Sequence, residues 1–184
     1  IVMNLLTKII IFLNKSYYYR KLAYLYQKWS VKRNPMNEIN RYYELRFRKK
    51  PNLYNPKNLI EKIYWMQLHC DTSIWTLCAD KYRMREYVTS CGCEEYLPKL
   101  YGVWNKSDEI DWYSLPKQFV IKANNGCASV LVVKDKSLYR EDSVKKQMKH
   151  WLDIPYGYRG FQPHYLSIKP CILAEELLVQ DKAL

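Results

Sequence analysis

The residues that suggest chemistry most directly are a lysine at the end of an apolar segment and the loop that follows it. Residues 118–123 form a continuous apolar run that ends in Lys122 and Ala123, and residues 124–129 read Asn-Asn-Gly-Cys-Ala-Ser. Small side chains let backbone N–H groups approach anionic oxygens, and a lysine adds a positive charge to the same polyphosphate. This pattern occurs in phosphate-binding hairpins, and it is more common in hairpins that bind no phosphate.

The two motifs that place a nucleotide on a helix N-terminus do not occur in the sequence. There is no Gly-x-x-x-x-Gly-Lys-[Ser/Thr] segment and no Gly-x-Gly-x-x-Gly segment. A nucleotide bound by this chain would therefore have to be held between sheets.

The elements that must position this hairpin follow from hydrophobic periodicity and turn residues. Asn58 and Glu61 have the spacing of a capping box, and Gly92 is a stop signal for the helix before it. Asn34-Pro35 should end the first helix. The expected helices cover residues 3–30, 37–50, 58–68, 73–88 and 140–152, and the expected strands cover residues 100–104, 118–123, 130–133 and 171–174.

The positive charge of the chain is concentrated in its N-terminal arm. The 184 residues carry a net charge of +12, and residues 1–50 hold 12 Lys and Arg against 2 Asp and Glu. An anionic membrane face, an acidic polymer or nucleic acid would suit such an arm, and so would a solvated helical face or a helix docked on the protein body. The apolar run at residues 9–13 is far shorter than the roughly 20 residues that span a bilayer.

The six cysteines form no Cys-x-x-Cys pair. His69, Cys70 and Cys78 are conceivable metal ligands, but buried free thiols are the stronger expectation. This cysteine usage favours a reducing compartment and therefore the cytoplasm.

Three segments resemble ATP-grasp enzymes, in the order in which those enzymes carry them. Residues 119–126 are similar to the strand and glycine-rich loop, residues 79–88 to the Asp-Lys helix, and residues 172–178 to the hinge strand that holds adenine. The likeness is closest to the TupA-like ATP-grasp family of bacterial teichuronopeptide and surface-polysaccharide loci, and it covers roughly residues 40–180. It rests further on the motifs in residues 55–63, 95–104, 114–122 and 168–170.

The resemblance implies an α+β fold, the N-terminal half of an ATP-grasp protein, with a helical N-terminal region followed by a small antiparallel sheet lobe. It divides the chain into a basic arm, residues 1–50, and a partial ATP-grasp domain, residues 51–184. The C-terminal lobe, which carries the acidic and Asn ligands for Mg²⁺ in such enzymes, is expected beyond residue 184.

The resemblance also implies roles for individual residues. Lys81 and Lys122 would contact the ATP phosphates, Lys122 also the adenine edge, and the loop 124–129 would close over the β- and γ-phosphates. The Glu176 carbonyl and the Leu178 N–H would read adenine, with Glu175 near N6 or the ribose. The implied ATP-binding residues are Lys81, Lys122, Asn124, Asn125, Gly126, Cys127, Ala128, Ser129, Glu175, Glu176 and Leu178.

Several of these residues also have interpretations that involve no ATP binding. Lys81 could be a surface helix residue, Glu175 and Glu176 could be ordinary strand-end carboxylates, and Asp80 could orient Lys81 or cap a helix turn. The loop also departs from the family pattern, which has several glycines and a histidine, because residues 124–129 contain one Gly. Ala or Ser at a position that requires positive φ costs about 1 kcal/mol or more.

The function implied by the family is ATP- and Mg²⁺-dependent joining of a carboxylate to an amine during cell-surface polysaccharide or teichuronopeptide synthesis. The acceptor would be a carboxylate-bearing sugar or peptide, and nucleic acid is not an expected partner. The location would be cytoplasmic, with the basic arm at the inner membrane face. The alternative is a non-catalytic remnant or scaffold protein of a glycosyltransferase locus. No catalytic residue or metal ligand is assigned, and the chain alone is expected to be inactive.

Overall fold

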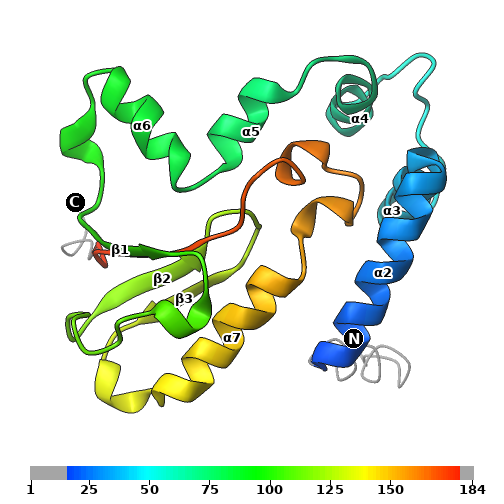
Figure 1. Cartoon of the computed structure of the whole chain (residues 1–184). Helices are drawn as coiled ribbons and strands as arrows, with labels where there is room; N and C mark the ends of the chain where they lie inside the picture. Colours follow the sequence, from blue (N-terminus) through cyan, green and yellow to red (C-terminus); the bar gives the residue numbers. More distant parts are fainter. Residues whose placement is uncertain (1–15, 179–184) are drawn as a thin grey trace, which may run out of the picture. The chain divides into compact units, whose positions relative to one another are not determined.

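The computed structural model describes residues 16–178 and is drawn in Figure 1. Internal contacts divide the chain into two compact units. The helical unit comprises Ile1–Asp71 and Gly157–Pro163, and the sheet unit comprises Thr72–Tyr156 and His164–Leu184. The domain division at residue 50 stays a prediction.

Helices and antiparallel strands make an α+β fold, as the sequence predicts. The helical unit contains α2 (Tyr17–Arg33), α3 (Pro35–Phe47) and α4 (Leu59–His69). The sheet unit contains α5 (Ser73–Ala79), α6 (Arg83–Ser90), β1 (Leu100–Trp104), β2 (Phe119–Ala123), β3 (Val130–Val133), α7 (Glu141–Asp153) and β4 (Ile172–Glu175). The 3₁₀ turns are η1 (Glu94–Tyr96), η2 (Ser107–Glu109), η3 (Lys136–Leu138), η4 (Tyr156–Tyr158) and η5 (Pro163–Tyr165).

The break between α2 and α3 lies where the sequence predicts it. The Asn34 side chain accepts a hydrogen bond from the Met36 N–H at 2.9 Å, and Pro35 is the first residue of α3. Pro is favourable there because the first helical N–H has no intrahelical partner. Residues 3–15 of the expected first helix lie outside the described residues. Within residues 16–178 no helix is long and apolar enough to cross a bilayer.

Glu61 organises the start of α4. The capping box with Asn58 is present, as predicted, and the carboxylate also accepts hydrogen bonds from the N–H groups of Lys57 and Asn52 and from the Tyr43 hydroxyl. The backbone N–H of Lys57 is the strongest of the contacts that lower the pKa of Glu61 from 4.5 to about 2. An ionised carboxylate therefore joins α3, α4 and the loop between them.

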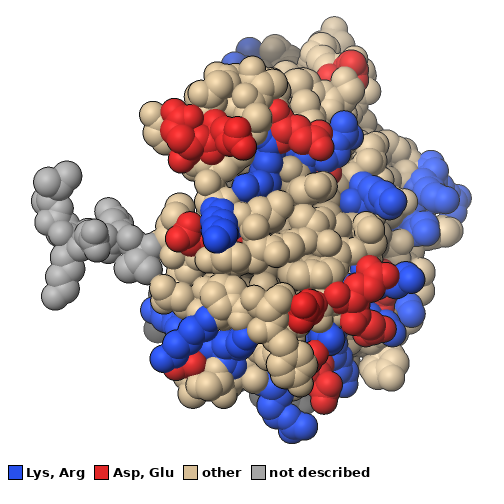
Figure 2. Space-filling model, turned by 60° about the vertical axis from the view of Figure 1, so that its left-hand side comes forward, with Lys and Arg blue, Asp and Glu red and all other residues tan. Residues whose placement is uncertain are grey.

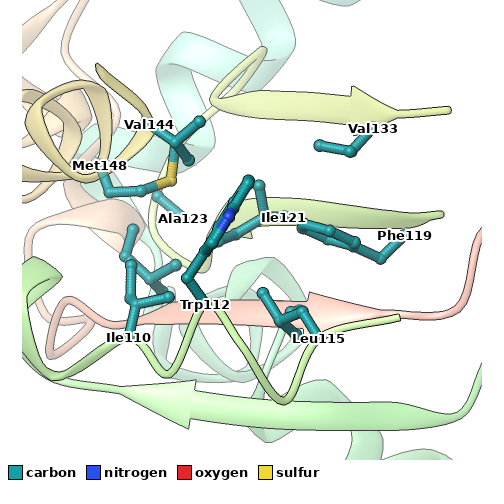
Figure 3. Packing of buried hydrophobic residues seen from close by; sticks show 11 residues of the cluster. Ile110, Trp112, Leu115, Phe119, Ile121, Ala123, Val133, Val144 and Met148 are labelled. Atoms are coloured by element: carbon teal, nitrogen blue, oxygen red, sulfur yellow. The ribbon is translucent and has the colours of Figure 1, made fainter. Parts of the chain in front are cut away.

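The sheet has the strand order β1-β4-β2-β3, and all of its neighbours are antiparallel. Phe119, Ile121 and Ala123 alternate along β2 and are buried, so one face of the sheet forms the core. Val144 and Met148 of α7 cover this face, and Figure 3 shows their side chains above those of β2. The core cluster is completed by Ile110, Trp112, Leu115, Val133, Ile172 and Ala174.

The single helix expected over residues 73–88 is wrong, because the structure has two helices there, α5 and α6. Asp80 causes the break. Its backbone is extended, with φ −73° and ψ 103°, and its carboxylate accepts hydrogen bonds from the N–H groups of Tyr82 at 3.0 Å and Arg83 at 3.2 Å. Asp competes well for such N–H groups and is therefore favoured at helix starts. Lys81 consequently lies in a turn rather than on a helix surface.

The Glu61 network predicts an acid-sensitive helical unit. A carboxyl group whose pKa is lowered in the folded state stabilises the fold above its unfolded pKa and loses this effect as the pH falls. The stability should therefore decline between about pH 4.5 and pH 2. Glu61→Gln loses the charge and one of the two acceptor oxygens, so it should lower the midpoint of thermal unfolding at pH 7 by several degrees. It should also flatten the decline of stability between about pH 4.5 and pH 2, the acid limb of the profile. Circular dichroism melts across the pH range measure both effects. An unchanged acid limb in Glu61→Gln would contradict the assignment.

Candidate functional site

The face of the sheet opposite the core carries the candidate site. Lys122 pairs with Val130 on β3 and with Leu173 on β4, so these side chains share one face. Val120 pairs in the same way with Val132 and Glu175. Val130 and Val132 are each 42% exposed, whereas Leu173 and Glu175 are buried, so the accessible apolar surface of this face lies on β3.

Glu175 holds Lys122 in place. Its carboxylate forms an ion pair with the Lys122 Nζ and another with the Arg85 Nη1 at 2.9 Å. Arg85 also donates a hydrogen bond from Nη2 to the Pro98 carbonyl at 2.8 Å. Glu175 is 4% exposed, so this carboxylate is buried between two cations and fixes the position of both. Lys122 of the β2–β3 hairpin thus lies against the hinge strand β4, so both elements can contribute to one site.

Lys81 reaches the hairpin loop from the turn between α5 and α6. Its backbone N–H donates to the Asn124 carbonyl at 3.2 Å, and its ammonium group donates to the carbonyls of Gly126 and Asn124. Burial lowers the pKa of Lys81, and the positive charge of Lys122 lowers it further. Within residues 16–178 no carboxylate lies within ion-pair distance of Lys81. Two ammonium groups therefore lie near each other with one paired carboxylate, an arrangement that favours an added anion.

Asn124 has a structural role that the sequence does not reveal. Its side-chain amide donates to Asp80 Oδ1 at 3.0 Å and to the Lys169 carbonyl at 2.9 Å, and its Oδ1 accepts from the Cys171 N–H at 2.8 Å. The side chain is buried and its hydrogen-bonding groups are occupied. Asn124 therefore joins the turn of Lys81, the hairpin loop and the approach to β4.

The loop reaches solvent at its second half. Asn125 and Gly126 are buried, Cys127 and Ala128 are exposed, and Ser129 is intermediate. Ala128 has φ +64°, a left-handed conformation that costs an L-residue about 1–2 kcal/mol. The strain expected from a loop with few glycines is therefore present, and it lies at one residue.

The hinge segment leaves backbone groups available. The Glu176 N–H donates to the Lys99 carbonyl at 2.9 Å, which extends the pairing of β1 with β4. Within the described residues, no hydrogen bond is recorded for the Glu176 carbonyl or the Leu178 N–H, and both residues are exposed. These are the two groups that the sequence resemblance assigns to adenine.

A groove of about 640 Å³ lies beside the site rather than over it. Arg85, Pro98 and Lys99 contribute to its walls, whereas Lys81 and Lys122 do not. On the face shown in Figure 2, acidic and basic side chains are intermingled, so a single-sign field does not cover it.

Metal ligation has no support in the part of the chain that the structure describes, because no three His, Cys, Asp or Glu residues cluster there. The described residues therefore do not make a Mg²⁺ site on their own. The six cysteines are free, as expected, but the expected burial is wrong for most of them. Cys171 is buried, Cys93 is intermediate, and Cys70, Cys78, Cys91 and Cys127 are exposed.

The comparison with protein families agrees with this geometry. The model of the TupA-like ATP-grasp family matches residues 61–184, which is more than half of the chain. The chain belongs to the TupA-like ATP-grasp family. No curated protein and no solved structure is significantly similar to it. The matched region contains every residue assigned from the resemblance, from Lys81 to Leu178.

Two features of this TupA-like chain escape sequence reasoning. The first is the role of Arg85, which lies four residues after Lys81, on α6. Its partner Glu175 is distant in sequence, so the pair follows only from the fold. Val130 and Val132 read as buried strand residues, but the alternation of β3 leaves them on the open face.

Ala128→Gly should stabilise the sheet unit. Gly adopts positive φ without the Cβ penalty, although it adds backbone entropy to the unfolded chain. The expected net gain in the free energy of unfolding is about 0.5–1 kcal/mol. Urea unfolding followed by fluorescence measures the change. Cys127→Gly is the matched control, because Cys127 is exposed in the same loop without positive φ, and it should lower stability. Equal effects of the two changes would contradict strain at Ala128.

Proposed function

We propose that the open face of the sheet binds ATP, and that the chain is the ATP-binding part of a carboxylate–amine ligase of bacterial cell-surface polysaccharide or teichuronopeptide synthesis. The observation that carries the proposal is that the Lys81 ammonium group donates to carbonyls of the loop that follows Lys122. The two lysines come from a helix turn and a strand that are 41 positions apart, and the charge of Lys122 also lowers the pKa of Lys81. The family match supports the same ligand class.

Each part of the face suits one part of ATP. Lys81 and Lys122 supply positive charge for the phosphates, and Cys127 and Ala128 are exposed at the solvent side of the loop. Val130 and Val132 offer apolar surface for the base. The Glu176 carbonyl and the Leu178 N–H are the acceptor and donor for the adenine edge. Asn124, Asn125 and Gly126 would shape the loop, and Glu175 would orient Lys122.

The protein would act mainly by positioning charge. ATP, when bound, supplies the phosphoryl group that activates a carboxylate for attack by an amine. Lys122 is held by Glu175, and Lys81 by the loop carbonyls, so both ammonium groups would meet the phosphates with little reorganisation. The acceptor class we propose is a carboxylate-bearing sugar or peptide. The cytoplasm, with the basic arm at the inner membrane face, is the location that fits it.

A non-catalytic role is the second candidate function. Ala128 strains the loop that closes over the phosphates, and residues 16–178 contain no cluster of metal ligands. A protein that binds a nucleotide or a polysaccharide-locus partner without turnover agrees with both observations. Phosphate release from ATP in the presence of polymer acceptors separates the two candidates.

ATP should protect Cys127 from alkylation. The thiol is exposed in the loop next to the proposed phosphates, so bound ATP should slow its reaction with iodoacetamide at least severalfold. Site-resolved mass spectrometry reports each cysteine separately. Cys70 and Cys91 are exposed and lie in other elements, so their rates should not change and they serve as internal references.

Lys122→Met should abolish this protection, because the variant loses the strand-end ammonium group. Lys106→Met is the matched control, since Lys106 is an exposed lysine of the sheet unit that pairs with Glu109. If ATP leaves the alkylation rate of Cys127 unchanged in the chain without substitutions, the proposed function is contradicted. Protection that survives in Lys122→Met would show that ATP binds elsewhere.

A further inference from the structure

Helix α2 carries a row of large side chains that the described part of the chain leaves exposed. Its exposed residues Tyr18, Leu22, Leu25, Tyr26 and Trp29 are between 49% and 78% exposed. Their spacing of four, seven, eight and eleven residues from Tyr18 places them on one side of an α-helix. We call these five residues the α2 stripe. The opposite side packs inward: Val31 is buried, and the ring of Tyr24 packs edge-on against that of Tyr158, with the ring centroids 5.7 Å apart.

The charge around the α2 stripe has one sign. The 17 residues Tyr17–Arg33 contain Arg20, Lys21, Lys28, Lys32 and Arg33 and no Asp or Glu. At 100° per residue, Lys21, Lys28 and Lys32 form a second row along one edge of the stripe. The Arg33 guanidinium lies over the Trp29 ring at 5.6 Å. Apolar, aromatic and cationic groups therefore share one face.

We propose that the α2 stripe docks the protein on a membrane surface of anionic lipids, with the helix lying in the plane of the interface. Leu22 and Leu25 would enter the acyl boundary, and the Tyr and Trp rings would lie at headgroup depth, where their polar edges stay hydrated. The lysine row would contact lipid phosphates while its methylene stems cover apolar surface.

Charge and apolarity together favour this occupant over two others. A second copy of α2 would bring five more cations against the first five, which opposes pairing. Nucleic acid would satisfy the cations but would leave aliphatic residues at the centre of the face without an apolar partner. An anionic lipid surface offers both negative charge and apolar depth. The proposal concerns the helical unit alone and does not rest on ATP binding.

Vesicle flotation with the full chain tests the proposal. Vesicles of phosphatidylcholine with phosphatidylglycerol should bind the protein, and vesicles of phosphatidylcholine alone should bind it far more weakly. Replacing Lys21, Lys28 and Lys32 by Ser should weaken binding by about fivefold for each lysine, which is about 1 kcal/mol each. Leu22→Ser with Trp29→Ser should weaken it by about tenfold or more even at low salt.

Matched controls distinguish binding through the α2 stripe from non-specific binding by exposed apolar side chains. Tyr113→Ser with Leu138→Ser removes two side chains that are 85% and 81% exposed in the sheet unit, and it should bind vesicles like the parent chain. Circular dichroism confirms that each variant is folded. All variants should keep the ATP protection of Cys127, so failure of this proposal can be distinguished from failure of the ATP proposal.

Several results would overturn the inference. One is equal binding to neutral and anionic vesicles, and another is full binding by the α2 variants with loss of binding on deletion of residues 1–15. The idea also fails if the Leu22 and Trp29 changes convert a dimer to a monomer without affecting vesicle binding, because the occupant is then a second copy. Binding to duplex nucleic acid with no binding to vesicles would assign the cations to a different partner.

Discussion

The hydrogen bonds of Asn124 are the constraint on which the candidate site depends. This one side chain connects Asp80 before Lys81, the Lys169 carbonyl and the Cys171 N–H before β4. Its backbone carbonyl also accepts from the Lys81 N–H. Because the side chain is buried, losing any of these partners would leave a polar group without water, which costs about 1–3 kcal/mol. Lys81, the loop and the hinge strand are thereby held as one arrangement.

The segments held by Asn124 contain two locally unfavourable features. Lys81 lies half-buried near Lys122 and its pKa is lowered, and Ala128 keeps a left-handed backbone in the exposed part of the loop. Both features destabilise the free protein locally. Strained residues and perturbed pKa values concentrate at functional sites because a ligand can offset their cost. A polyphosphate would neutralise the two ammonium groups, whereas the strain at Ala128 is intrinsic to the backbone and would remain.

Local signals in the sequence predict most helices and strands well, but they do not predict which distant segments contact one another. The capping box of Asn58 and Glu61, the break at Pro35 and the hairpin around residues 124–129 are each encoded within a few residues, and each is confirmed. The sequence offers Asp80 as a helix-turn cap but not as a break between two helices, because apolar residues continue at helical spacing on both sides of it. A carboxylate that caps the next helix outweighs that periodicity.

Contacts between distant segments lie outside such reasoning. Glu175 shows no sign in the sequence of its two cationic partners, 53 and 90 positions earlier in the chain. The pair with Lys122 depends on β2 lying beside β4, and the pair with Arg85 depends on the placement of α6. The buried, fully bonded state of Asn124 is hidden for the same reason, since a polar loop residue predicts exposure. The α2 stripe differs, because its helical periodicity can be read from the sequence. The structure adds which side of the helix is exposed.

Calorimetric titration of ATP into the chain tests whether Lys81 and Lys122 bind its phosphates. Binding should be saturable and should weaken by about tenfold or more in Lys81→Met and in Lys122→Met, because each ammonium group contributes a charge-assisted contact of about 1.5–3 kcal/mol. The double variant should lose more than the sum of the two, since in each single variant the remaining lysine is freed from repulsion and binds the phosphates better. No heat of binding in the parent chain, or equal affinities in all four proteins, would contradict this role of the two lysines.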